Sequence, residues 1–192
     1  NALQFGASDE AWVYNVRGLT YDLLGDYDLA IADFELAIEL APNYEAAIQN
    51  LGYVYGVRLD DWKQYTAQYR TLVELDPSNS DYYNGLGWGL VKQGRYREGR
   101  AELDTALELN PENASALDSR GWAYLGLEDF ASAEADFRAA IELGEFYSYY
   151  GLAELFHAQG DDDQALQNLR TYLDEAGEDA DPAALELQDL LR

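Results

Sequence analysis

The sequence predicts an all-α fold, a right-handed α-solenoid of stacked antiparallel helix pairs with a C-terminal capping helix. The first observation behind this prediction is a glycine that recurs about every 34 residues along the 192-residue chain, at Gly18, Gly52, Gly87 and Gly121. Periods of this length are typical of repeat proteins. The second observation is that each period holds two segments of helical pattern separated by a short turn. Such pairs bury their apolar faces by stacking on the next pair.

The residues around each recurring glycine explain how one repeat is built. Small residues at Gly18 and Ala30 allow the two helices to approach closely, and Phe34 fills the space beside them. Left-handed glycine caps are expected to end first helices, at Gly25, Gly94 and Gly160. Aspartates favour the starts of second helices, at Asp26 and Asp161. Prolines are expected to end second helices, at Pro42, Pro77 and Pro111.

These signals divide the chain into one domain. Residues 1–8 are expected to be a flexible N-terminal remnant, and 9–192 a single solenoid. The repeats are predicted at 11–44, 45–79, 80–113, 114–145 and 146–179, and the capping helix at 182–192. First helices are predicted near 9–24, 44–58, 80–93, 114–126 and 146–159. Second helices are predicted near 27–40, 61–75, 96–109, 130–143 and 162–175.

Three repeats depart from the common pattern. Repeat two carries one extra residue near 59–61, and Tyr65 stands where other second helices have alanine or glycine, so this helix is expected to stand further off. Repeat four is short and lacks the closing proline. In repeat five Ala153 replaces the recurring glycine and Phe156 the tyrosine.

The same spacings return in later repeats as in the first, which has Gly18, Tyr21, Ala30, Phe34 and Pro42. On these residues the chain resembles the tetratricopeptide repeat family over nearly its whole length. The resemblance implies that the first helices line a concave groove and that the protein binds other proteins there. The residues expected to bind a partner in this groove are Trp12, Asn15, Leu19, Asn50, Tyr53, Asn84, Trp88, Asp118, Trp122, Tyr150 and Glu154. The same face is expected to include Asp22, Gln49, Asp81, Lys92, Ser115, Ser119, Leu125, Tyr147 and His157.

Two residue types recur along this face. Tryptophan and tyrosine offer a large contact area at low entropic cost, which makes them frequent binding hot spots. The amides of Asn15, Asn50 and Asn84 can both donate to and accept from an extended peptide backbone. Two alternatives stay open. The tryptophans can instead pack between neighbouring first helices, and the amides can be exposed and idle.

The charge balance limits the partners. Asp and Glu total 37 against 12 Lys and Arg, a net charge of −25. Such a surface repels nucleic acid and anionic lipid, and no run of 18 apolar residues suits a membrane span. Members of this family that bind a chaperone's C-terminal carboxylate use lysine and arginine in the groove. This chain has Asp81 and Asp118 among the matching positions. The expected partner is therefore a neutral to basic protein or peptide.

No residue pattern predicts catalysis, a metal site or a cofactor. Cysteine is absent and His157 is the single histidine, which excludes a thiolate or multi-histidine zinc site. Residues 161–163 are consecutive aspartates without the spacing, central glycine and closing glutamate of a calcium loop, so they are interpreted as a helix start. The sequence shows no phosphate-binding glycine loop.

The sequence therefore predicts a non-enzymatic scaffold or adaptor that holds a peptide or helical segment in its concave groove. Two alternatives remain: a self-associating structural or assembly protein, and the recognition arm of a larger enzyme. The chain begins at Asn1 and contains no methionine, so a processed or excised form is expected. A cytoplasmic or, after removal of a signal, an extracytoplasmic location is open.

Overall fold

The computed structural model describes residues 7–177 and 180–191, and in these ranges every regular element is a helix. The elements are α1 (Ala7–Leu24), α2 (Tyr27–Leu40), α3 (Glu45–Tyr53), the π-helix η1 (Val54–Arg58), α4 (Trp62–Leu75), α5 (Ser80–Lys92), α6 (Tyr96–Leu109), α7 (Ala114–Gly126), α8 (Phe130–Glu142), α9 (Ser148–Ala158), α10 (Asp162–Ala176) and α11 (Pro182–Leu190). The predicted all-α solenoid is confirmed.

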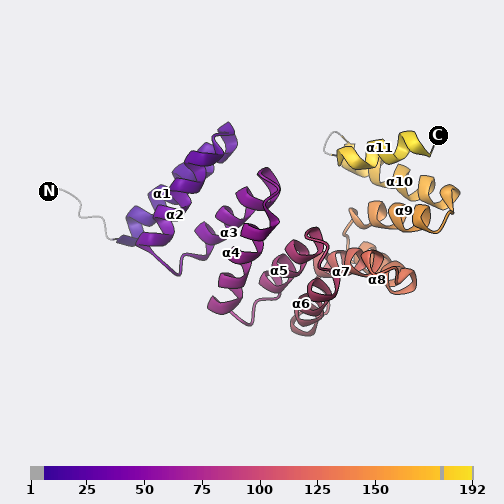
Figure 1. Ribbon diagram of the computed structural model, residues 1–192, viewed down its shortest axis with the longest axis horizontal. Helices are drawn as coiled ribbons and strands as arrows, with labels where there is room; N and C mark the ends of the chain where they lie inside the picture. The colour runs from indigo at the N-terminus through magenta and orange to yellow at the C-terminus, as the bar shows by residue number, and fades with distance from the viewer. Residues whose placement is uncertain (1–6, 178–179, 192) are drawn as a thin grey trace.

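The helix pairs follow one another along a curved row, from α1 and α2 at one end to α9, α10 and α11 at the other (Figure 1). The buried residues form a series of clusters that link neighbouring helices. One cluster joins Val91 of α5 and Leu103 of α6 to Ala116 of α7 and Ala140 of α8. The core therefore runs along the row, as expected for repeats that stack on their neighbours.

Helix α1 begins at Ala7, inside the predicted remnant 1–8, whose residues 1–6 lie outside the described part of the chain. At the other end α11 finishes at Leu190, and residue 192 of the predicted helix 182–192 also lies outside the described part.

Small residues bring the two helices of a pair into backbone contact. A Cβ atom added to Gly99 of α6 would lie 2.8 Å from the carbonyl oxygen of Gly87 in α5. In the first pair a Cβ atom on Gly18 would lie 2.7 Å from the ring of Phe34, which is fully buried. Any larger residue at these glycines would push the helices of the pair apart.

The predicted helix ends are present in most repeats. Gly25, Gly94 and Gly160 take left-handed backbone conformations, with φ of 81°, 73° and 78°. The side chain of Asp161 accepts a hydrogen bond from the backbone N–H of Gln164, whereas Asp26 occupies the cap position of α2 without a side-chain bond.

Repeat two absorbs its extra residue in a π-helical turn. Residues Val54–Arg58 form η1 directly after α3, so the insertion lies before the predicted position near 59–61. A π-turn holds one more residue than an α-turn, which lets the chain re-enter the common register at α4. The displaced Arg58 forms an ion pair with Asp22 of α1, with Nε 3.0 Å from Oδ1.

Tyr65 is accommodated by glycines on the facing helices. Tyr65 is 7% exposed. A Cβ atom on Gly56 would lie 2.5 Å from the Tyr65 ring, and one on Gly89 would lie 2.6 Å from it. At this point the large residue lies on the second helix and the small residues lie on first helices, the reverse of the usual packing.

The last repeat starts later than predicted and is covered by α11. Gly144 has φ of 97°, and residues 145–147 precede α9, which begins at Ser148 rather than near 146. Ala184 and Leu187 of α11 pack on Leu169 and Tyr172 of α10. The backbone N–H of Asp181 donates to the Tyr172 hydroxyl at 2.9 Å, which fixes the start of α11.

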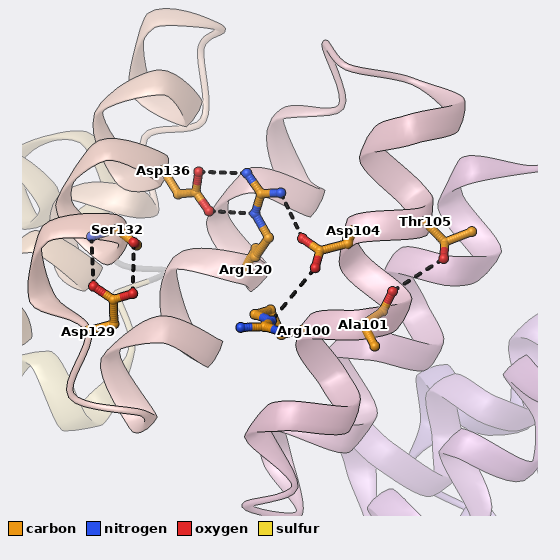
Figure 2. A network of polar contacts seen from close by, with 8 residues as sticks. All are labelled: Arg100, Ala101, Asp104, Thr105, Arg120, Asp129, Ser132 and Asp136. Carbon is orange, nitrogen blue, oxygen red and sulfur yellow. Dashed lines mark hydrogen bonds and ion pairs between the residues drawn. The ribbon is translucent and has the colours of Figure 1, made fainter.

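Arg120 of α7 joins two second helices through ion pairs (Figure 2). Its guanidinium donates to both carboxylate oxygens of Asp136 in α8, at 2.7 and 2.9 Å, and to Oδ1 of Asp104 in α6 at 2.9 Å. Asp136 is 7% exposed, so it depends on this partner. Arg17 and Asp33 form the corresponding pair in the first repeat, at 2.6 Å.

Replacement of Arg120 by Ala is expected to lower the free energy of unfolding by about 1–3 kcal/mol, because it leaves the buried Asp136 carboxylate without a donor. Arg138→Ala is the matched control. It removes an exposed arginine that bonds to Glu134 within α8 and should cost at most about 0.5 kcal/mol. Urea unfolding followed by circular dichroism compares the two, and equal losses would contradict the structural role of Arg120.

Candidate functional site

Two adjoining depressions run along α5, α7 and the start of α9. The larger one, of about 770 Å³, is lined by Trp88, Val91, Lys92, Tyr96, Asp118, Trp122, Leu125, Gly126, Tyr147, Tyr150, Tyr172, Asp181 and Ala183. The smaller one, of about 470 Å³, is lined by Tyr65, Tyr69, Asp81, Asn84, Gly85, Trp88, Ser115, Asp118, Ser119, Glu145 and Tyr147. Because Trp88, Asp118 and Tyr147 line both, the depressions form one continuous groove, called the main groove below.

Half-buried aromatic rings form the walls of the larger depression. The Trp122 ring lies 5.7 Å from Phe137 in an edge-on contact and 5.5 Å from Tyr150. Tyr150 in turn lies 5.5 Å from the buried Tyr172. The rings are therefore held by the core while part of their surface faces the groove. Such fixed rings offer contact area to a ligand at little entropic cost.

Asp118 lies where the two depressions meet. The Ser148 hydroxyl donates to its Oδ1 at 2.6 Å. Burial raises the pKa of Asp118 to about 7, and the nearby Glu145 carboxylate acts in the same direction, whereas Ser148 and Trp122 lower the pKa. The protein therefore holds a carboxyl group here whose charge changes near neutral pH.

Polar groups on α5 and α7 line the smaller depression. The Asn113 amide donates to Ser80 Oγ at 2.8 Å and to Asp81 Oδ1 at 2.9 Å. The Oδ1 atom of Asn84 is buried and has no hydrogen-bond partner among the described residues. A buried acceptor without a partner is costly, and a donor that entered the depression would relieve this cost.

Lys92 supplies a cation to the larger depression. Its Nζ lies 5.2 Å from the ring centre of Trp62 and 5.5 Å from that of Trp88. These distances are those of cation–π contacts. The two tryptophans lie edge-on to each other with their centres 6.5 Å apart. The aromatic walls thus already hold one ammonium group that belongs to the chain.

Five of the predicted groove residues are brought together in the main groove: Asn84, Trp88, Asp118, Trp122 and Tyr150. The other six lie outside its lining: Trp12, Asn15, Leu19, Asn50, Tyr53 and Glu154. All five in the groove come from α5, α7 and α9. The other six come from α1, α3 and α9.

Asn15, Asn50 and Asn84 do not form the predicted row of amides that are free to bind a peptide. Asn15 is 5% exposed, its Oδ1 accepts from Asn50 at 2.9 Å, and its Nδ2 donates to the Tyr44 hydroxyl at 3.4 Å. Both polar groups of the Asn15 amide are therefore already bonded within the protein. Asn50 also stands one position beyond Gln49, the residue that follows Asn15 by one period. Asn84 alone of the three lines the main groove.

The remaining predicted residues lie in separate surroundings. Trp12 is exposed and lines a depression of about 640 Å³ with residues 41–44. Leu19 and Tyr53 are exposed, and the Arg58 guanidinium lies over the Tyr53 ring. Glu154 accepts a hydrogen bond from the Tyr150 hydroxyl at 2.9 Å and lines a further depression beside Leu125.

Several groove residues were not predicted because they come from second helices and from the end of the chain. Tyr65 and Tyr69 belong to α4, Tyr96 to α6 and Tyr172 to α10, and Asp181 precedes α11. The prediction assigned the groove to first helices alone. Tyr65 carried a signal, since it departs from the small residue expected at its position.

The fold and the groove define a class of protein: a helical-repeat protein that offers an open, aromatic-walled surface. Residues 11–44, and the overlapping stretches 84–147 and 119–182, match models described as tetratricopeptide repeat. The chain belongs to the tetratricopeptide repeat family. Proteins of this family mediate interactions with other proteins.

Solved structures of similar shape agree with the fold. A thermophilic tetratricopeptide repeat protein of Thermus thermophilus has a TM-score of 0.76 and 25% identity, with 94% of this chain and 96% of that chain covered. PilW, a type IV pilus biogenesis factor, has a TM-score of 0.79 and 20% identity over 94% of this chain and 84% of that chain. YrrB, described as having an unusual peptide-binding site, has a TM-score of 0.60 and 21% identity over 92% and 90%.

A curated protein of Guillardia theta, uncharacterized protein ycf37, is 40% identical over 43 residues. The match covers 22% of this chain and 24% of that protein. Within residues 7–177 and 180–191, no three histidine, aspartate or glutamate side chains are grouped as metal ligands would be. None of the described helices is both long and apolar enough to span a membrane.

Asp118→Asn is expected to stabilise the protein increasingly as pH rises. Because the pKa of Asp118 is raised from 3.8 to about 7 on folding, the folded protein holds the proton more tightly, and wild-type stability is lost as pH rises between these values. Asparagine does not titrate. The gain in unfolding free energy over wild type should grow by roughly 2 kcal/mol between about pH 5 and pH 8.

Urea unfolding at a series of pH values measures this difference. Glu108→Gln, which removes an exposed carboxylate from α6, is the control and should leave the pH dependence unchanged. A difference between Asp118→Asn and wild type that is constant with pH would contradict a raised pKa.

Proposed function

We propose that the protein is an interaction scaffold that holds a polypeptide segment in the main groove. The observation that carries this proposal is the continuous groove itself, which is walled by Trp88, Trp122, Tyr147 and Tyr150 and contains the unpaired side-chain oxygen of Asn84. Its rings are anchored by the core, so a bound segment pays little ordering cost on the protein side.

The groove suits an extended or helical segment better than a small molecule. It is elongated and is lined by residues from α4 to the start of α11. The Asn84 carbonyl oxygen, buried without a partner, is matched by the N–H groups that a polypeptide presents. YrrB, which shares this fold, is described as having a peptide-binding site.

The combined substitution of Trp88 and Trp122 by Ala is expected to weaken peptide binding by at least about tenfold, because it removes two anchored rings. Peptides are first selected from a phage-displayed random library on the immobilised wild-type chain. Their affinities for the folded variants are then measured by fluorescence anisotropy. Trp12→Ala, which removes an exposed tryptophan outside the main groove, is the matched control and should leave affinity unchanged.

Two results would contradict the proposal. One is unchanged affinity in the double variant. The other is a stability loss of about 3–5 kcal/mol at each site, which is the cost of deleting a fully buried aromatic residue and would make Trp88 and Trp122 core residues.

Self-association is a second candidate function, favoured by one face of α1. Trp12, Val16, Leu19 and Leu23 recur at helical spacing and are 59%, 40%, 39% and 83% exposed. An exposed apolar stripe of this kind marks an interaction surface. In this second candidate function, the stripe binds another copy of the chain.

The sedimentation coefficient of the wild-type chain is then expected to rise with concentration, and Leu23→Glu should abolish the rise by placing a charge in the stripe. Leu185→Glu, at an exposed position of α11, is the control. If the sedimentation coefficient stays constant while the concentration rises about a hundredfold, self-association is contradicted.

A further inference from the structure

Buried aspartates in this protein are paired with arginine. Asp22, Asp33 and Asp136 are the aspartates of the described chain that are less than a tenth exposed. Asp22 bonds to Arg58, Asp33 to Arg17, and Asp136 to Arg120. This pairing is expected, because a carboxylate removed from water needs a compensating charge or several donors.

The carboxylates of the smaller depression are less buried than these aspartates, and none of them is paired with arginine. Asp81 accepts from the Asn113 amide at 2.9 Å, Asp118 from the Ser148 hydroxyl at 2.6 Å, and Glu145 from the Ser115 hydroxyl at 3.1 Å. All of these donors are neutral. In the described part of the chain, no arginine, lysine or histidine forms an ion pair with any of the three carboxylates.

The other walls of this depression also favour a cation. The rings of Tyr69, Trp88 and Tyr147 line it, and none of its lining residues is basic. The neighbouring depression shows what such rings hold, since Lys92 places its ammonium group over Trp62 and Trp88. Asn84 adds a buried acceptor that lacks a donor.

We propose that the smaller depression of the main groove, with Asp81, Asp118 and Glu145 around aromatic walls, binds an arginine or lysine side chain of the segment that the groove holds. The cation pairs with these carboxylates as Arg17, Arg58 and Arg120 pair with aspartates elsewhere in the chain. Its N–H groups meet acceptors that neutral donors satisfy only in part, and its charge lies against ring faces. This inference rests on the proposed function, because the cation arrives as part of a bound polypeptide.

The test uses one peptide selected from the random library on the full 192-residue chain. The peptide is synthesised in two forms, one as selected and one with its arginine replaced by citrulline or its lysine by norleucine. Loss of the cation is expected to weaken binding to the wild-type chain by about tenfold or more, because charge-assisted hydrogen bonds are stronger than those between neutral groups.

Asp118→Asn is the matching change in the protein, and it keeps the shape of the side chain and an acceptor for Ser148. Asp118→Asn should lower the affinity for the cationic peptide by a similar factor. The neutral peptide should bind the wild-type chain and the variant with the same affinity. Glu108→Gln, outside the groove, should bind both peptides as wild type does. Thermal unfolding of each variant confirms that the chain remains folded.

The outcomes separate this inference from the proposed function. If the selected peptides lack arginine and lysine, or if citrulline and Asp118→Asn each change affinity less than about twofold, the cation site is wrong while binding in the groove stands. If the double substitution of Trp88 and Trp122 leaves peptide affinity unchanged, the proposed function itself fails. If the cationic and neutral peptides differ in affinity for Asp118→Asn as much as they do for the wild-type chain, the cation binds elsewhere and the inference is overturned.

Discussion

Close approach of the two helices within a pair is the constraint on which the rest of the structure depends. In repeat three the backbones of Gly87 and Gly99 leave no room for even one methyl group between them. In repeat four the Phe137 ring occupies the space left by Gly121 and Gly151, so it locks α8 against both α7 and α9. Because these contacts fix the rotation of each first helix about its axis, they also fix which residues face the main groove.

The distribution of arginine sets the electrostatics of the molecule. With 12 basic residues against 37 acids, few cations are available for pairing. The structure uses Arg17, Arg58 and Arg120 where aspartates are buried between helices. In the groove, Asp118 is held by a neutral hydroxyl, and its pKa is raised because no cation offsets its burial. The buried aspartates are thus paired with arginine, whereas the carboxylates of the smaller depression are not.

The aromatic rings of the groove have two roles at once. Trp122 packs edge-on against Phe137 in the core and also lines the groove. Trp122 therefore packs between helices, as one sequence alternative expected, and also lines the groove. Its contact with a partner stays a prediction. A ring held in this way is preorganised for a ligand, because its rotamer is already restricted by the core.

The sequence by itself determined the helices and the order in which they stack. The predicted bounds 27–40, 96–109 and 114–126 match α2, α6 and α7, because glycine, aspartate and proline act on the local backbone and are visible in a single repeat. It also indicated Asn84, Trp88 and Asp118, which stand at regular positions on first helices.

Only the tertiary structure decided where the irregular parts lie and which surface is open. The extra residue of repeat two is absorbed in η1, since a one-residue insertion can be taken up at any turn of a helix at similar local cost. Asn15 and Asn50 bond to each other, and Tyr172 reaches the groove from a second helix. Such contacts join residues far apart in the chain, and they depend on how successive pairs rotate and pack, which no local pattern records.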